Sequence, residues 1–175
     1  MDKRYIVTVV CYALGLISAN EFAQAETVGR YECSVVGPVS QEPIGDKDGH
    51  RLISIQYSCF GVEGLVKGAL YSGTATNEWD GPQATYLFGG GITRAAGGLA
   101  VAQVTEGASG PVIMEEGKPV GNEFSGKGVF KFASGTLAAL SGKAVRWETK
   151  PAGFGRFTLE IRTDEEAGAI RTSKE

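Results

Sequence analysis

"FSGKGVFKFASGTLAALSGKAVRWE", residues 124–148, is the stretch that most decides the fold. Side chains alternate between the two faces of a strand, so Gly126 and Gly128 fall on the same face as Phe124 and Phe130. A missing side chain at such a position lets a coiled strand bend, or lets a neighbouring aromatic ring lie over the backbone. The stretch therefore predicts strands of a strongly curved sheet.

Other segments of the chain show the same alternation of apolar and polar residues. Residues 155–163 are the clearest case, and residues 50–59 and 84–90 repeat it. A period of two is typical of a half-buried strand. The side chains expected on the buried faces are Phe157, Leu159 and Ile161 in the first segment, Ile53, Ile55, Tyr57 and Cys59 in the second, and Ala84, Tyr86 and Phe88 in the third.

Eight or nine such segments, separated by Gly, Pro, Asn and Asp, follow one another after residue 25, and none has a convincing helical period. The sequence predicts an all-β protein, a single antiparallel β-barrel of about eight strands, with a closed β-sandwich as the alternative. Closure would remove the exposed strand edges. We expect the barrel domain to cover residues 26–163 and residues 164–175 to form a polar, disordered tail.

The N-terminus has the composition of a secretory signal peptide. A net-positive start is followed by an apolar run from Tyr5 to Ile17 and by the small-x-small site Ala23-Gln24-Ala25. The alternative is an uncleaved anchor, but the run is shorter than the roughly 20 residues that a membrane span needs. We expect cleavage after Ala25 and a secreted or periplasmic mature protein.

Two cysteines, Cys33 and Cys59, follow the expected cleavage site. In an oxidising compartment two cysteines in separate strands most simply form a disulfide with each other. The alternative is a pair of buried thiols. A redox-active pair would normally have C-x-x-C spacing, which these residues lack.

Residues 121–128, "GNEFSGKG", match seven of the eight positions of a phosphate-binding loop, G-x-x-x-x-G-K-[ST]. The eighth position is Gly128, which has no hydroxyl for magnesium. The residues that follow favour a strand, whereas a phosphate loop leads into a helix whose N-terminus faces the phosphates. We therefore expect no nucleotide binding.

Composition and charge exclude several other classes of function. The net charge of −3 and the absence of a basic stripe argue against nucleic-acid binding. No second apolar span follows the N-terminal one, so we do not expect an integral membrane protein. His50 is the single histidine and is expected to face solvent at a strand start, which leaves no multi-histidine metal site. Asp46 and Asp48 indicate a β-turn rather than a calcium loop, and no cofactor is expected.

The remaining polar candidates lie in "NEWDG", residues 77–81, and at two arginines. Glu78 and Asp80 would share one face of a strand, and paired carboxylates can perform acid–base catalysis. The alternative is a hairpin turn at Asp-Gly with Trp79 plugging the barrel end. Trp79, Arg94 and Arg146 are candidate ligand-binding residues, although arginines are more often on the surface.

The stretch that begins at Gly126 resembles the glycine-punctuated pattern of the allene oxide cyclase and dirigent-like barrels, a superfamily that includes many small bacterial proteins. The matching positions are Gly126-x-Gly128-x-Phe130, then Ala133-x-Gly135, then Leu140-x-Gly142. The resemblance covers the last third of the chain, and it implies an eight-stranded antiparallel barrel with a central cavity. It assigns no catalytic residue, because no position outside the glycine framework can be matched.

Two classes of function follow. The sequence favours a non-catalytic barrel that binds a small apolar ligand or an envelope protein, because no recognisable nucleophile, metal set or acid–base pair is present. The alternative is an isomerase or cyclase that shapes its substrate inside an apolar cavity, and it rests on fold analogy alone.

Overall fold

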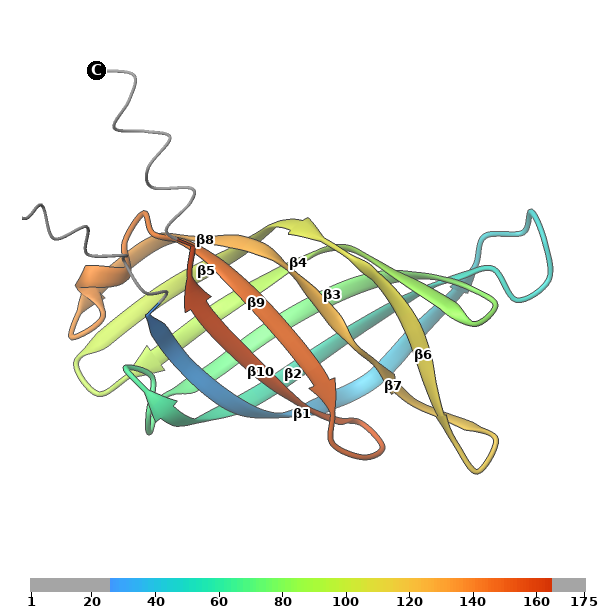
Figure 1. The fold of residues 1–175 in the computed structure, drawn as a ribbon, viewed down its shortest axis with the longest axis horizontal. Coiled ribbons are helices and arrows are strands. Elements are labelled where there is room, and N and C mark those ends of the chain that lie inside the picture. The colour runs from blue at the N-terminus through green and yellow to red at the C-terminus, as the bar shows by residue number, and fades with distance from the viewer. Residues whose placement is uncertain (1–25, 165–175) are drawn as a thin grey trace, which may run out of the picture.

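The structure is a computed structural model that describes residues 26–164. These residues form ten strands and one short 3₁₀ helix, and eight of the strands close into an antiparallel barrel (Figure 1). The predicted β-barrel is confirmed. The elements are β1 (Thr27–Pro43), β2 (Arg51–Gly64), β3 (Leu70–Asp80), β4 (Gln83–Ala95), β5 (Gly98–Gly107), β6 (Ser109–Glu115), β7 (Lys118–Asn122), β8 (Phe124–Gly135), η1 (Ala138–Leu140), β9 (Ala144–Pro151) and β10 (Arg156–Thr163).

The barrel runs in the order β3-β2-β1-β10-β9-β8-β5-β4, and the pairing of β3 with β4 closes it. The β3–β4 ladder is long, from Leu70 opposite Arg94 to Asp80 opposite Gln83. On the other side β1 pairs with β10, so the first and last strands of the described chain are neighbours. The barrel therefore has no open edge along its wall.

Strands β6 and β7 form a hairpin that extends the barrel at one end (Figure 1). The hairpin lies between β5 and β8 in the sequence, and β6 pairs with the start of β4 through Thr85 and Ser109. The turns between β1 and β2, β3 and β4, β6 and β7, and β9 and β10 all lie at this end, which we call the mouth.

The opposite end of the barrel is filled with apolar side chains. Val66, from the β2–β3 connection, is fully buried, and Leu137 and Leu140 close the barrel from the turn that contains η1. Phe130 and Val28 are buried in the same cluster. The two ends of the barrel are therefore unlike, since one is plugged by packed side chains.

A bulge in β4 reverses one expected face. Tyr86 pairs with Asn77 and Phe88 pairs with Thr76, so Leu87 is an extra residue in β4 that has no partner in β3. The extra residue turns the side chains that follow it to the opposite face of the strand. Phe88 is consequently 63% exposed, whereas Ala84 and Tyr86 are buried. The prediction that Phe88 shares their buried face is wrong, because simple alternation does not survive a bulge.

Residues 121–128 are strand rather than a phosphate loop. They cover the end of β7 and the start of β8, and no helix follows them before residue 138. Lys127 is half-exposed on the outer surface, with its Nζ 3.7 Å from a carboxylate oxygen of Glu106. Gly126 and Gly128 do share a face with Phe124 and Phe130, as expected.

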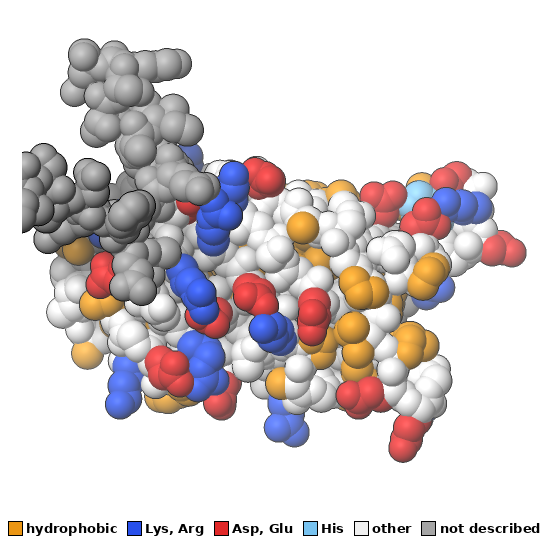
Figure 2. Space-filling view, in the orientation of Figure 1, with side chains coloured by type: hydrophobic (Ala, Val, Ile, Leu, Met, Phe, Trp, Pro, Cys, Tyr) orange, Lys and Arg blue, Asp and Glu red, His pale blue; other side chains and the backbone are white. Residues whose placement is uncertain are grey.

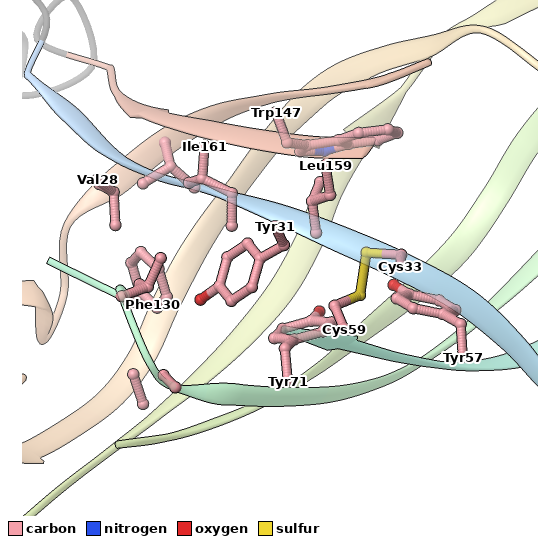
Figure 3. Packing of buried hydrophobic residues seen from close by; sticks show 14 of the residues in the cluster. Val28, Tyr31, Cys33, Tyr57, Cys59, Tyr71, Phe130, Trp147, Leu159 and Ile161 are labelled. Atoms are coloured by element: carbon pink, nitrogen blue, oxygen red, sulfur yellow. A yellow bond between two sulfur atoms is a disulfide. The ribbon is translucent and has the colours of Figure 1, made fainter. Parts of the chain in front are cut away.

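Cys33 and Cys59 form the expected disulfide. The two residues are directly opposite each other in the β1–β2 ladder, and both are buried. Figure 3 shows the bridge inside the barrel beside the rings of Tyr57 and Tyr71. The disulfide therefore joins two neighbouring strands from within the buried core.

The first barrel strand begins at Thr27 and the last ends at Thr163. The expected signal peptide, residues 1–25, and residues 165–175 of the expected tail lie outside the described residues. Asp164 still packs against the barrel, where its backbone N–H donates to the carbonyl of Ala144 at 2.9 Å. Among residues 26–164, no helix has the length and apolarity that crossing a bilayer would require.

The two cysteines of the disulfide are separated by 26 positions in the sequence. The double variant Cys33→Ala/Cys59→Ala should lose about 3 kcal/mol of unfolding free energy, because the unfolded chain regains the entropy of an open loop. Denaturant unfolding followed by circular dichroism measures this difference. A loss below about 1 kcal/mol would contradict the expectation.

Gly126 should be the most size-restricted position of residues 121–128. A Cβ there would lie 2.7 Å from Cζ2 of Trp147 and would also meet the carbonyl oxygen of Glu106. Gly126→Val should therefore cost about 1–3 kcal/mol of stability. Lys127→Ala is the matched control and should change stability by less than about 0.5 kcal/mol. Thermal melts measure both variants. If the two substitutions lowered the melting temperature equally, the close packing of Trp147 against Gly126 would be contradicted.

Candidate functional site

The mouth half of the barrel contains a cavity of about 670 Å³. This volume lies within the range of about 300–1,000 Å³ that is usual for small-molecule sites. Most of its wall is apolar or aromatic. The large side chains that line it include Ile53, Tyr57, Tyr71, Trp79, Tyr86, Phe124, Trp147, Phe154 and Phe157.

The cavity wall is built from aromatic rings set against inward-facing glycines. A Cβ on Gly73 would lie 2.6 Å from Cζ of Tyr57 and 2.7 Å from Cε1 of Tyr71, and one on Gly107 would lie 2.8 Å from Cδ1 of Tyr86. The rings thus occupy space that a side chain on the neighbouring strand would need. This arrangement keeps them close to the wall.

Burial keeps the tyrosines of the cavity neutral. It raises the pKa of Tyr86 and of Tyr57, and it raises the pKa of Tyr71 well above the usual value, with Tyr57 beside it adding to the shift. The rings of Tyr57 and Tyr71 stack at 5.9 Å between centroids. At neutral pH these hydroxyls can donate or accept hydrogen bonds, but they carry no charge.

Three polar side chains in the cavity wall have buried atoms without a hydrogen-bond partner among the described residues. They are Oδ1 of Asn77, Nε1 of Trp79 and Nδ2 of Asn122. Asn77 is the deepest, with 5% of its surface exposed. Buried polar atoms are normally paired, so these three are unusual.

Glu78 and Asp80 share a face, as predicted, but it is the outer face of β3. The inward residues of that strand end are Asn77 and Trp79. Glu78 accepts from His50 at 2.7 Å, and Asp80 accepts from Lys47 at 2.7 Å. The two carboxylates therefore lie outside the cavity and hold the β1–β2 turn against β3.

The three candidate ligand-binding residues are divided between the two faces. Trp79 lines the cavity, whereas Arg94 is exposed on the outside of β4. Arg146 is half-exposed on the outside of β9, where its Nε donates to Oδ1 of Asp164 at 3.2 Å. The structure brings neither Arg94 nor Arg146 to the cavity. The arginines that do reach its rim are Arg51 and Arg156.

The predicted solvent-facing position of His50 is wrong. Only 11% of its side chain is exposed, because the ring lies between Asp46 and Glu78. Nδ1 is 2.6 Å from Oδ1 of Asp46, and the hydrogen bonds to Glu78 and Asp46 raise the pKa of His50. Among residues 26–164, no group of three or more His, Cys, Asp or Glu residues is placed to hold a metal ion.

The sequence did not indicate that Asn77, Asn122 and Tyr71 line a cavity, and Tyr57 and Tyr86 were expected only to be buried. A signal for Asn77 was available, because Tyr71, Gly73, Ala75 and Asn77 follow one face of β3 at a period of two. The expected hairpin turn at Asp80-Gly81 does connect β3 with β4, but β3 continues to Asp80, so Asn77 is part of the strand. Asn122 carries no comparable signal, because its position depends on the β6–β7 hairpin.

The fold and the site together define a closed eight-stranded antiparallel barrel with an aromatic cavity open at one end. Comparisons with protein-family models, with curated proteins and with solved structures found no match to this chain.

The contacts of His50 predict that stability depends on pH. The folded pKa is raised above the unfolded value of about 6.5, so the stabilisation is fully present below that pH and is lost as the pH rises through the folded pKa. The denaturation midpoint should therefore fall over this interval, and His50→Gln should remove that fall. Because His50 is the only histidine, its NMR titration reports the folded pKa directly. A value at or below about 6.5 would refute the prediction.

Proposed function

We propose that this protein is a secreted or periplasmic barrel that binds a small, largely apolar molecule in its cavity. The observation that carries the proposal is the cavity of about 670 Å³, lined mainly by apolar and aromatic side chains. A cavity of this size and lining buries most of the surface of a small ligand, and removal of that surface from water supplies the binding free energy.

The chemistry of the wall supports binding rather than acid–base catalysis. Among the described residues that line the cavity there is no carboxylate, histidine, lysine or free thiol. The ionisable side chains are the neutral tyrosines and the two rim arginines, Arg51 and Arg156. Arg51 is already engaged, since its Nη1 donates to Gln41 at 3.1 Å.

The second candidate is an isomerase or cyclase of the kind that the resemblance to allene oxide cyclase and dirigent-like barrels implies. The observation in its favour is the pair of buried, uncharged hydroxyls at Tyr57 and Tyr71 in the cavity wall, which hydrogen-bond to each other and leave one O–H to donate to an oxygen that gains negative charge. An enzyme of this type needs little beyond a shaped cavity and such donors.

The location outside the cytoplasm rests on two observations. The first is the signal-peptide composition of residues 1–25. The second is the Cys33–Cys59 disulfide, which is compatible with an oxidising compartment.

The cavity can be tested by filling it. Ala75 and Ala102 line it from β3 and β5, so Ala75→Phe and Ala102→Phe should each weaken binding of the neutral fluorescent probe N-phenylnaphthylamine by about tenfold or more, as expected when the ligand loses its space. Thr74→Phe is the matched control, because Thr74 is exposed on the outer face of β3. It should leave the affinity unchanged.

Thermal melts confirm that each variant is folded before its affinity is compared. Probe binding that persists undiminished in both cavity variants would place the probe elsewhere and contradict the proposed function. Conversion of a bound substrate, detected as a new product by mass spectrometry, would favour the isomerase or cyclase.

A further inference from the structure

The three residues that carry the unpartnered polar atoms lie on one continuous part of the cavity wall. Asn77 and Trp79 are two residues apart on β3, about 7 Å along the strand, and both face inward. Strand β4 follows β3, then β6 and β7, so Asn122 lies further along the same wall. Register supports this, since Trp79 pairs with Ala84, which pairs with Gly110.

Two other polar groups that line the cavity are paired within the protein. Trp147, the second tryptophan of the chain, donates its indole N–H to the carbonyl of Lys127 at 3.2 Å. Thr149 Oγ1 accepts from the backbone N–H of Phe124 at 3.2 Å. The three buried atoms without a partner all belong to the part of the wall that contains Asn77, Trp79 and Asn122.

A buried polar atom that lacks a partner destabilises the folded state. Asn77 lies in a series of inward residues that is otherwise apolar or small, and its Oδ1 has no hydrogen-bond partner among the described residues. An aliphatic side chain at this position would avoid the cost of burying an unpaired oxygen. The amide is therefore explained by something that binds in the cavity rather than by the fold.

The hydrogen-bonding groups and charges of the cavity wall restrict the chemical class of that molecule. A primary amide presents one donor and one acceptor side by side, and it pairs best with a group that offers the reverse on one edge. Asn77 lies opposite Ile53, whereas Arg51, the charged lining residue of the same strand, lies opposite Trp79 and donates to Gln41. The buried part of the ligand must then be uncharged.

The surrounding rings favour a flat molecule. Tyr86 lies 4.9 Å from Trp147 and 5.8 Å from Phe124 between ring centroids, and Trp79 is on the neighbouring strand. Aromatic faces and edges of this kind pack well against a planar ring.

We propose that the cavity selects an uncharged planar ring compound that carries a cyclic amide or an equivalent donor–acceptor edge. Asn77 pairs with that edge through both atoms of its amide, and the indole N–H of Trp79 donates to a carbonyl oxygen of the same ligand. Asn122 donates to a second acceptor nearer the mouth. This inference rests on the proposed function, since it names the ligand class of the same cavity.

Equilibrium dialysis with four bicyclic probes tests the inference. Carbostyril has a lactam edge, N-methylcarbostyril lacks the N–H donor, naphthalene lacks both polar atoms, and naphthoate carries a negative charge. Carbostyril should bind at least about tenfold more tightly than naphthalene, as two buried hydrogen bonds allow, with the N-methyl compound between them.

Asn77→Leu, which keeps the volume but removes the amide, should reduce the preference for carbostyril over naphthalene to about threefold or less, because the edge loses its partner. Trp79→Phe should reduce it partly. Gln56→Leu is the matched control, because Gln56 is an exposed amide on β2 between two cavity-lining residues. It should leave the preference unchanged.

Several results would overturn the inference and leave the cavity proposal intact. One is equal affinity for carbostyril and naphthalene in the native protein, which is also the result expected if ordered water pairs the three atoms. A second is a preference that survives Asn77→Leu. A third is tighter binding of naphthoate that Arg51→Gln abolishes. Failure of every probe, N-phenylnaphthylamine included, would instead overturn the proposed function and the inference with it.

Discussion

The hollow half of this barrel depends on aromatic rings that occupy the space above inward-facing glycines. An eight-stranded barrel is only just wide enough for its own side chains or for one small ligand. Tyr57 and Tyr71 lie over Gly73, and Trp147 lies over Gly126. Because these rings lie against the barrel wall, they do not fill the centre of the barrel, and the cavity remains open there.

The same constraint explains why the two ends differ. At the plugged end the inward side chains are large and point to the axis, with Phe130, Leu137 and Leu140 packed together. Towards the mouth the inward positions of β3 and β5 include the small residues Ala75 and Ala102. The rings there have glycines to lie against. Figure 2 shows hydrophobic side chains gathered toward the mouth end of one face, and charged side chains of both signs spread over the whole of that face. Entry from the mouth follows from this asymmetry.

Alternation of residue types was sufficient to predict the strands and the all-β fold, because these depend on which residues share a face. The disulfide was predicted on a different ground, since Cys33 and Cys59 are the two cysteines that follow the expected signal peptide. Alternation could not tell which face of a short polar segment points inward. Glu78 and Asp80 were placed on one face correctly, but Trp79 and Asn77 face the cavity instead. Phe88 was misplaced for a related reason, since the extra residue in β4 is set by pairing with β3 and leaves no mark in β4 alone.

Asn77 is an inward-facing residue of β3 that the packing of the barrel does not explain. Each inward side chain of β3 before it contributes to the packing of rings on glycines, and the outward carboxylate after it holds the β1–β2 turn through His50. Its Oδ1 has no hydrogen-bond partner among the described residues, and burial makes an unpaired oxygen costly. A residue that weakens the fold while facing an open cavity is best explained by the molecule that the cavity accepts. The unpaired indole of Trp79 on the same face, beside the paired indole of Trp147, supports that reading independently.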